Sequence, residues 1–167
     1  MKFELLGKMH DRNDFGCREP ALTHYLQNYA LQDQKRGLSR VHVLVNEQHP
    51  QRILGFYTLS MDSISTENFP IELSKPFGNR SFLPVALLGR MATNGNYKEA
   101  YQAEGLQIGR LLMANCIQRA FENEVGCVGM IVDAKNSKLV EYYQQFGFVT
   151  IDGGSTRLYL PRKAAGY

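Results

Sequence analysis

The chain has 167 residues, of which 44% are hydrophobic and 21% charged, as in ordinary globular proteins. This length suits one domain with its own core, so we expect a single domain over residues 1–167. The formal net charge of +3 permits a polyanionic partner without requiring one, because nucleic-acid binding depends on a local basic patch. No apolar stretch has the length of a signal peptide or a membrane span, so we expect a cytoplasmic protein without membrane contact.

Cysteine and histidine usage argues against a disulfide framework and against a metal centre. Cys17, Cys116 and Cys127 form an odd set without a C-x-x-C pair, which favours a reducing compartment and inert core thiols. None of the four histidines has the spacing of metal ligands. We therefore expect no bound metal.

The first half of the chain predicts a strand, a helix and a hairpin. A short strand is expected at Phe3–Leu6, followed by a helix over 21–33 with one apolar face. Residues 40–46 alternate valines with other side chains and predict a strand that pairs with a second strand at 52–59. The proline-containing stretch 63–82 predicts a long irregular loop or a weak helix, and such loops are often functional.

The middle of the chain predicts a strand that leads into a long helix. The strand covers 84–92, a polar connection follows over 93–104, and a helix with an apolar stripe covers 105–124. Free N–H groups and the helix dipole make the junction of a strand end and a helix start an anion-binding place. We therefore expect chemistry at Met91–Arg110.

The last third predicts a buried strand, a capped helix and two closing strands. The apolar run Val128–Val132 indicates a strand covered on both faces, and Asn136 or Ser137 caps the next helix. Gly147 ends that helix as a residue that tolerates positive φ. The closing strands end at Leu158–Leu160, so the element order predicts an α/β fold with a mixed sheet.

Two glycines at the predicted start of the long helix are compatible with a phosphate site. In EGLQIGR, Glu104 to Arg110, small residues let a pyrophosphate approach the main chain, and Arg110 adds a cation. A glycine pair at this place also serves packing or capping. Its meaning depends on the rest of the pattern.

That pattern resembles the GNAT superfamily of acetyltransferases, in particular the toxin branch found in two-gene toxin–antitoxin modules. The resemblance covers almost the whole chain. It rests on Arg12, Phe15-Gly16-Cys17, ALQDQKRGLSRVHV, ILGFYTLS, LLGRMA, EGLQIGRLL, VDAKN, EYYQQFGF and the closing RLYLP. It implies the GNAT fold, a central mixed β-sheet with helices on both faces.

The resemblance also implies an acetyl-CoA site, with one strand that pairs with the pantetheine arm and a loop that holds the pyrophosphate. The residues implied are Met91, Ala92 and Thr93 for the strand, and Glu104, Gly105, Leu106, Gln107, Ile108, Gly109 and Arg110 for the loop. Two positions depart from the family pattern. Glu104 replaces a basic or amide residue, and Gln107 replaces the middle glycine. We still expect binding, because the main-chain donors persist.

The tyrosine that precedes the Gly-Phe pair is the general acid of the family, and it corresponds to Tyr143. A phenol protonates the departing CoA thiolate when the two groups are aligned. Tyr142, one residue earlier, points about 100° away on the same helix and cannot share the role. Without the resemblance, a helical tyrosine such as Tyr143 would be read as packing. Asn136 either contacts the cofactor or only caps the helix.

In the toxin branch the acceptor is the α-amino group of aminoacyl-tRNA, and acetylation stops translation. The resemblance further implies a homodimer and a ribbon-helix-helix antitoxin as partner. A tRNA needs cationic contacts, and candidates near the expected site are Lys35, Arg36, Arg40, Arg80 and Arg90, although each also reads as a solvated surface charge.

Three functions from different classes stay open at this point. The first is the tRNA-acetylating toxin, with direct attack in a ternary complex. The second is an N-acetyltransferase that acts on protein N-termini or small amines. The third is a non-catalytic binding module, which the altered glycine loop would favour.

Overall fold

The computed structural model describes residues 1–67, 69–122, 124–151 and 156–167. Residue 68 of the predicted loop and residue 123 of the predicted long helix lie outside this part. The chain divides into two compact units, Met1–Ser60 with Gly89–Cys116, and Met61–Leu88 with Ile117–Tyr167. We describe each unit by itself.

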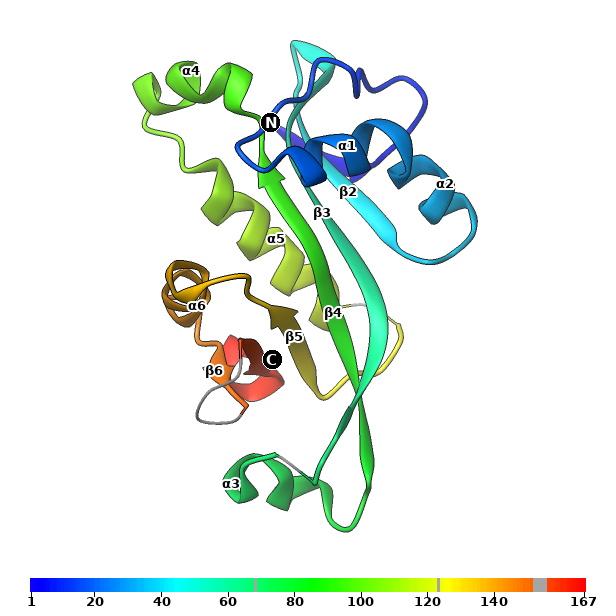
Figure 1. Cartoon of the computed structure of the whole chain (residues 1–167), viewed down its shortest axis with the longest axis vertical. Coiled ribbons are helices and arrows are strands. Elements are labelled where there is room, and N and C mark those ends of the chain that lie inside the picture. The colour runs from blue at the N-terminus through cyan, green and yellow to red at the C-terminus, as the bar shows by residue number, and fades with distance from the viewer. Residues whose placement is uncertain (68, 123, 152–155) are drawn as a thin grey trace. The chain divides into compact units, whose positions relative to one another are not determined.

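Seven strands form one sheet in the order β1-β2-β3-β4-β5-β7-β6 (Figure 1). The strands are β1 Lys2–Leu5, β2 Arg40–Asn46, β3 His49–Ser65, β4 Phe82–Thr93, β5 Gly129–Asp133, β6 Val149–Thr150 and β7 Arg157–Pro161. The helices are α1 Pro20–Asn28, α2 Ala30–Lys35, α3 Ile71–Ser74, α4 Lys98–Ala103, α5 Ile108–Phe121 and α6 Ser137–Gln144. Short 3-10 turns occupy Lys75–Phe77, Gly95–Tyr97 and Arg162–Ala165.

The first unit contains an antiparallel arrangement of β1, β2 and β3. Lys2 lies opposite Val45, and Arg40 lies opposite Leu59, so the predicted hairpin of β2 and β3 is confirmed. The strand β3 is longer than expected, because it continues through Met61 to Ser65 into the second unit.

One face of this antiparallel part packs on α1. Alternate valines of β2 (Val41, Val43 and Val45) share a buried cluster with Tyr25 and Leu26 of α1. Alternate residues of a strand point to opposite faces, so this cluster fixes the side on which α1 lies.

The other face of the same strands packs on α5. A Cβ atom at Gly55 would lie 2.7 Å from Leu112 Cδ1, and the Tyr57 hydroxyl donates a 2.7 Å hydrogen bond to Asn115 Oδ1. Both Leu112 and Asn115 belong to α5. Helices therefore cover both faces of the sheet, as the sequence predicts.

The predicted single helix over 21–33 is wrong, because two helices replace it. Tyr29 has φ of −116°, far from the helical value, and separates α1 from α2. Tyr29, at the break, is 49% exposed.

The second unit makes the sheet mixed. The strand β5 pairs parallel with β4, with Val85 opposite Gly129, and antiparallel with β7, with Ile131 opposite Tyr159. The stretch 63–82, predicted as a long irregular loop or a weak helix, continues β3 to Ser65, forms the short helix α3 and begins β4 at Phe82. Phe69 from this stretch packs on Tyr159, with 4.8 Å between ring centroids, so part of the predicted loop belongs to the core.

Candidate active site

The segment that follows β4 contains the helix α4, where the sequence predicts only a polar connection. This helix ends at Ala103 with Glu104 as its C-cap, and the φ of +71° at the following Gly105 favours glycine. The Leu106 N–H donates to the Tyr101 carbonyl, which closes the end of the helix. The next helix, α5, begins at Ile108 rather than at Gly105. Of the two glycines, therefore, only Gly109 lies in α5, while Gly105 terminates α4.

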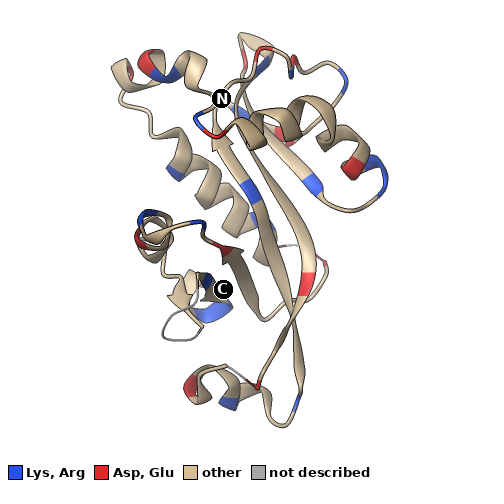
Figure 2. Ribbon diagram, in the orientation of Figure 1, with Lys and Arg blue, Asp and Glu red and all other residues tan. Residues whose placement is uncertain are grey.

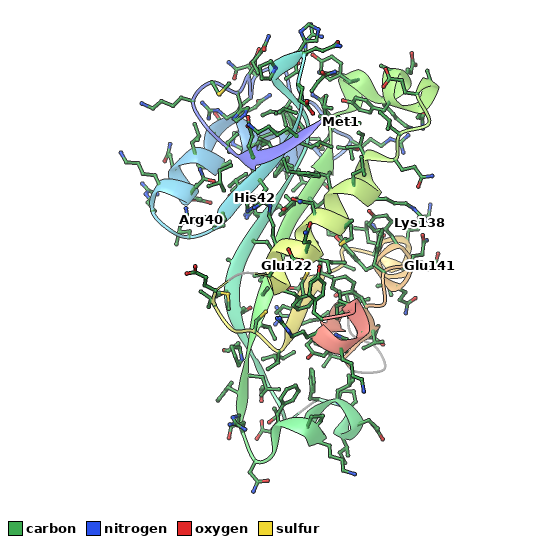
Figure 3. All side chains as sticks on the ribbon, turned by 180° about the vertical axis from the view of Figure 1, so that it is seen from behind. Met1, Arg40, His42, Glu122, Lys138 and Glu141 are labelled. Carbon is green, nitrogen blue, oxygen red and sulfur yellow. The ribbon has the colours of Figure 1, made fainter. Side chains whose placement is uncertain are left out.

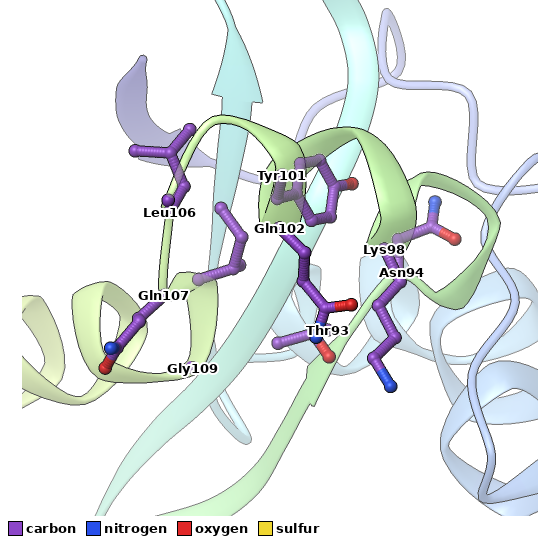
Figure 4. A pocket seen from close by; sticks show the side chains of 10 residues that line it. Thr93, Asn94, Lys98, Tyr101, Gln102, Leu106, Gln107 and Gly109 are labelled. Atoms are coloured by element: carbon purple, nitrogen blue, oxygen red, sulfur yellow. The ribbon is translucent and has the colours of Figure 1, made fainter.

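A pocket of about 450 Å³ lies where β4, α4 and α5 meet in the first unit (Figure 4). Such a volume lies in the range of small-molecule sites. The lining residues are Thr93, Asn94, Lys98, Tyr101, Gln102, Gly105, Leu106, Gln107, Ile108 and Gly109.

The charge of the pocket favours an anion. Lys98 is the one charged side chain among the ten lining residues, all of which are described. The pocket also includes Ile108 and Gly109, the first two residues of α5, which is 14 residues long. The helix dipole is positive at such a helix start. The pocket therefore suits a phosphate group.

Tyr101 forms a largely apolar part of the pocket wall. The residue is 8% exposed, and its hydroxyl has no hydrogen-bond partner among the described residues. Burial raises the pKa of this phenol, and the nearby Tyr97 and Asp14 raise it further. The Tyr101 hydroxyl is thus protonated at physiological pH.

A buried asparagine fixes the end of β4. Asn94 is 1% exposed, and its Nδ2 donates to the Ile53 carbonyl at 2.9 Å. Its Oδ1 accepts from the N–H groups of Gly16 at 3.3 Å and Asn96 at 3.1 Å. The Gly95 N–H donates back to the Gly16 carbonyl at 2.6 Å, so the pocket wall is held by the N-terminal loop.

The predicted cofactor residues fall into two groups. Six of them line the pocket: Thr93, Gly105, Leu106, Gln107, Ile108 and Gly109. Met91 and Ala92 precede the pocket on β4, while Glu104 and Arg110 are exposed and outside its lining. Four further lining residues, Asn94, Lys98, Tyr101 and Gln102, were not predicted from the sequence. Three of them could have been found by their spacing, because Tyr101 and Gln102 follow Lys98 by three and four residues and so share one face of a helix.

Tyr143 and Asn136 belong to the second unit, on and before α6. The Asn136 side chain accepts from the Leu139 N–H at 3.0 Å, so its predicted capping role is confirmed. Tyr143 is 8% exposed and packs between rings, at 5.7 Å from Phe148 and 5.4 Å from Tyr142. The helix ends before Gly147, whose φ of +90° agrees with the prediction.

Four of the five predicted tRNA-contacting cations belong to the first unit. Figure 2 marks all Lys and Arg positions in blue along the ribbon. The Gln34 side chain accepts from the Val41 N–H at 3.0 Å, which joins the end of α2 to the start of β2. This contact brings Lys35 and Arg36 to the same end as Arg40, which Figure 3 shows beside His42 on β2.

The fourth cation, Arg90 on β4, lies near Arg40 because both are linked to Tyr25 and its neighbour Ser39. Its guanidinium stacks on the Tyr25 ring, and the Tyr25 hydroxyl contacts Ser39 Oγ at 3.5 Å, next to Arg40. All four cations are exposed. We call Lys35, Arg36, Arg40 and Arg90 the basic cluster. The fifth cation, Arg80, lies in the second unit and donates to the Phe77 carbonyl at 2.7 Å.

The cysteines and the possible metal ligands of the described residues give no sign of a reactive thiol or a metal centre. Cys116 and Cys127 are buried, and burial raises the pKa of both thiols, while Cys17 is only partly buried. Across residues 1–67, 69–122, 124–151 and 156–167, no three His, Cys, Asp or Glu side chains are grouped to hold a metal. In the same ranges, no helix has both the length and the apolar character to cross a membrane.

Comparisons of the sequence identify relatives that match along most of their length. The description "Acetyltransferase (GNAT) family" matches residues 98–148. A probable toxin TacT from Sinorhizobium fredii is 24% identical over 161 residues, covering 91% of this chain and 85% of the relative. A tRNA-acetylating toxin from Mycobacterium tuberculosis is 28% identical over 138 residues, covering 83% and 78%.

Solved structures of similar fold cover nearly the whole chain. A Tyr-to-Phe mutant of KacT has a TM-score of 0.85 at 25% identity, covering 99% of this chain and 96% of KacT. AtaT complexed with acetyl-methionyl-tRNAfMet has a TM-score of 0.86 at 23% identity, with the same coverage. A mutant AtaT bound to the C-terminus of the antitoxin AtaR has a TM-score of 0.78 at 22% identity, covering 99% and 95%.

The family match begins at Lys98 and ends at Phe148, so it includes α4, the pocket loop, α5 and α6. The seven-stranded mixed sheet confirms the predicted GNAT fold. The family uses acetyl-CoA, an anionic acyl donor with which the charge of the pocket agrees. Residues 98–148 therefore match the GNAT acetyltransferase family, and the chain has the fold of the solved structures to which it is similar.

Proposed function

We propose that this protein is a toxin that transfers the acetyl group of acetyl-CoA to the α-amino group of aminoacyl-tRNA and thereby blocks translation. The observation that carries the proposal is the pocket between β4, α4 and the start of α5, in a chain of the GNAT fold. The two relatives described above are named as toxins, one of them as tRNA-acetylating, which supports this substrate class.

The acetyl-CoA phosphates fit the pocket by charge and by main-chain chemistry. Thr93 at the end of β4, Gly105 to Gly109 and the first turn of α5 are the residues that would hold the donor. Main-chain N–H groups bind phosphate oxygens irrespective of side chain, so Gln107 in place of a glycine does not remove them. Glu104 lies outside the pocket lining and therefore puts no carboxylate against a phosphate there.

The basic cluster supports a tRNA as the acceptor. A tRNA presents closely spaced phosphates, and cations bind them mainly through sequence-independent electrostatic contacts. Lys35, Arg36, Arg40 and Arg90 present four such cations at one end of the first unit. AtaT, which shares the fold, has been solved in complex with acetyl-methionyl-tRNAfMet.

The proposed chemistry is a direct attack in a ternary complex. The amine nitrogen bonds to the thioester carbonyl carbon, the carbon–sulfur bond breaks, and the sulfur leaves with the bonding electron pair. Tyr143 donates its hydroxyl proton to that sulfur, and the nitrogen loses one proton to water. An α-amino group titrates near 7.7–8.0, and the adjacent ester lowers this value, so much of it is neutral without a strong base.

The partners follow from the same resemblance. We propose a homodimer that is neutralised by a ribbon-helix-helix antitoxin, and AtaT has been solved with its antitoxin AtaR. The single domain over residues 1–167 is part of this proposal. A cytoplasmic location fits a substrate that works at the ribosome.

The test is to incubate the purified protein with acetyl-CoA and total aminoacylated tRNA, then to identify acetylated aminoacyl adenosines by mass spectrometry. The proposal expects one or a few aminoacyl-tRNAs to gain an acetyl group. Acetylation of peptides or small amines, with none on charged tRNA, would instead make the protein an N-acetyltransferase of those substrates. A lack of acetyl-CoA binding would leave a non-catalytic binding module.

A further inference from the structure

The family pattern places a basic or amide residue just before the pyrophosphate loop, and this chain has an acid there. The residue is Glu104, which follows α4 as its C-cap and is exposed outside the pocket lining. A phosphate ligand still needs a counter-charge, because N–H groups and a helix dipole offset only part of its negative charge. The pocket therefore calls for a cation from another position.

Lys98 meets this requirement by its place in the fold. It is the first residue of α4 and lines the pocket with Tyr101 and Gln102, which lie three and four residues later on the same helical face. Figure 4 shows the Lys98 and Gln102 side chains extending from α4 in the same direction, toward the end of β4. The facing wall of the pocket is the start of α5.

The ammonium group of Lys98 is available for a ligand. Within the described residues it has no hydrogen bond or ion pair. The nearby carboxylates, Glu99 on α4 and Glu104 at its C-cap, do not line the pocket. The neighbouring Tyr101 hydroxyl is also buried without a partner in the described part of the chain. Two polar groups of one wall thus lack protein partners in a pocket of positive charge.

From these positions we infer that Lys98 pairs with a phosphate group of bound acyl-CoA and takes over the charge role that Glu104 cannot fill. This inference rests on the proposed acetyl-CoA site. It assigns Lys98 as a binding residue that sets donor affinity, and it assigns no role in the chemical step.

The test measures the dissociation constant of acetyl-CoA by isothermal titration calorimetry for the wild type and for Lys98→Met. Loss of one partly exposed ion pair weakens binding by about three- to fivefold at low salt. The difference shrinks in 0.5 M salt, because the pair is screened.

Two further variants separate charge from size. Lys98→Arg keeps the charge and is expected to bind within about twofold of wild type. Lys8→Met removes one exposed lysine outside the pocket and should leave the dissociation constant unchanged. Thermal melting checks that each variant is folded, and Lys98→Gln serves if Lys98→Met is not.

A second donor shows which phosphate is bound. If Lys98→Met weakens the binding of acetyl-dephospho-CoA, which lacks the 3′-phosphate, by the same factor as that of acetyl-CoA, Lys98 pairs with the pyrophosphate. If wild type and Lys98→Met bind acetyl-dephospho-CoA equally well, Lys98 pairs with the 3′-phosphate. Equal acetyl-CoA binding by wild type and Lys98→Met overturns the inference and leaves the proposed function intact. If the wild type itself does not bind acetyl-CoA, the proposed function fails.

Discussion

The guanidinium carbon of Arg90 lies 3.8 Å from the centroid of the Tyr25 ring. Stacking uses the flat face of the guanidinium, so its edge N–H donors remain able to bind phosphate oxygens. Tyr25 is itself held in the core with Leu26 and contacts Ser39 through its hydroxyl. A long, flexible side chain is thereby ordered before any ligand arrives, which lowers the entropy cost of binding.

Replacing Arg90 by methionine should weaken the use of charged tRNA. We expect the KM for aminoacyl-tRNA to rise about fivefold, as for the loss of one phosphate contact, and the salt dependence of KM to become less steep. The dissociation constant of acetyl-CoA should not change, because Arg90 does not line the pocket. Steady-state kinetics at several salt concentrations measure the effect.

The matched control for Arg90 is Tyr25→Phe, which keeps the ring and removes the hydroxyl. This variant should retain nearly the wild-type KM. Arg90→Met kinetics that equal wild type at low salt would remove Arg90 from the tRNA surface.

Tyr143→Phe should keep the fold and the binding of acetyl-CoA but lose turnover. Phenylalanine preserves the ring packing on Phe148 and Tyr142 and removes only the proton donor. General acids contribute about 10²- to 10⁴-fold, so kcat should fall in that range. Growth arrest on expression should disappear with it.

Tyr142→Phe is the control on the neighbouring position of α6, and it should retain wild-type turnover. Turnover of Tyr143→Phe at the wild-type rate would exclude Tyr143 as the acid.

Tyr101→Phe and Tyr97→Phe should differ in their effect on the free energy of unfolding. The Tyr101 hydroxyl is buried without a partner in the described chain, so its removal should leave the free energy of unfolding unchanged or raise it by about 1 kcal/mol. The Tyr97 hydroxyl donates to an Asp14 carboxylate oxygen, so its removal should cost about 1–2 kcal/mol. Urea unfolding of both variants checks the contrast, and equal losses would contradict it.

Gly55→Ala should destabilise the contact between β3, β4 and α5. A Cβ atom at Gly55 would lie 2.7 Å from Leu112 Cδ1 and 3.0 Å from the Ala92 carbonyl oxygen. Leu112 can shift but the carbonyl cannot, so we expect a loss of about 1–3 kcal/mol. Gly126→Ala is the control, since nothing lies within 4 Å of its added Cβ. Similar unfolding midpoints for the two variants would show that β3 tolerates the added methyl.

The features that could be predicted from the sequence are those that depend on residues close to one another along the chain. The Asn136 cap, the Gly147 stop and the alternating β2 are local patterns of caps and side-chain periods, and all three are present. The GNAT pattern added the loop at Gly105 to Gly109, which does line the pocket.

The features that sequence reasoning missed depend on distant contacts. The short helix α4 buries only Tyr101, so it has no apolar stripe that would announce a helix. Asn94 reads as a turn residue, because the partners that bury it at Ile53 and Gly16 are far away along the chain. The break at Tyr29 likewise has no proline or glycine to mark it.

The Asn94 amide makes the beginning of the chain a structural component of the pocket. Its bond to Gly16 spans 78 positions, so the wall at the end of β4 closes only after both segments have been synthesised. Chains that lack the first sixteen residues would also lack this support of the pocket wall. Removing the N-terminal loop would disable acyl-CoA binding without altering a single lining residue.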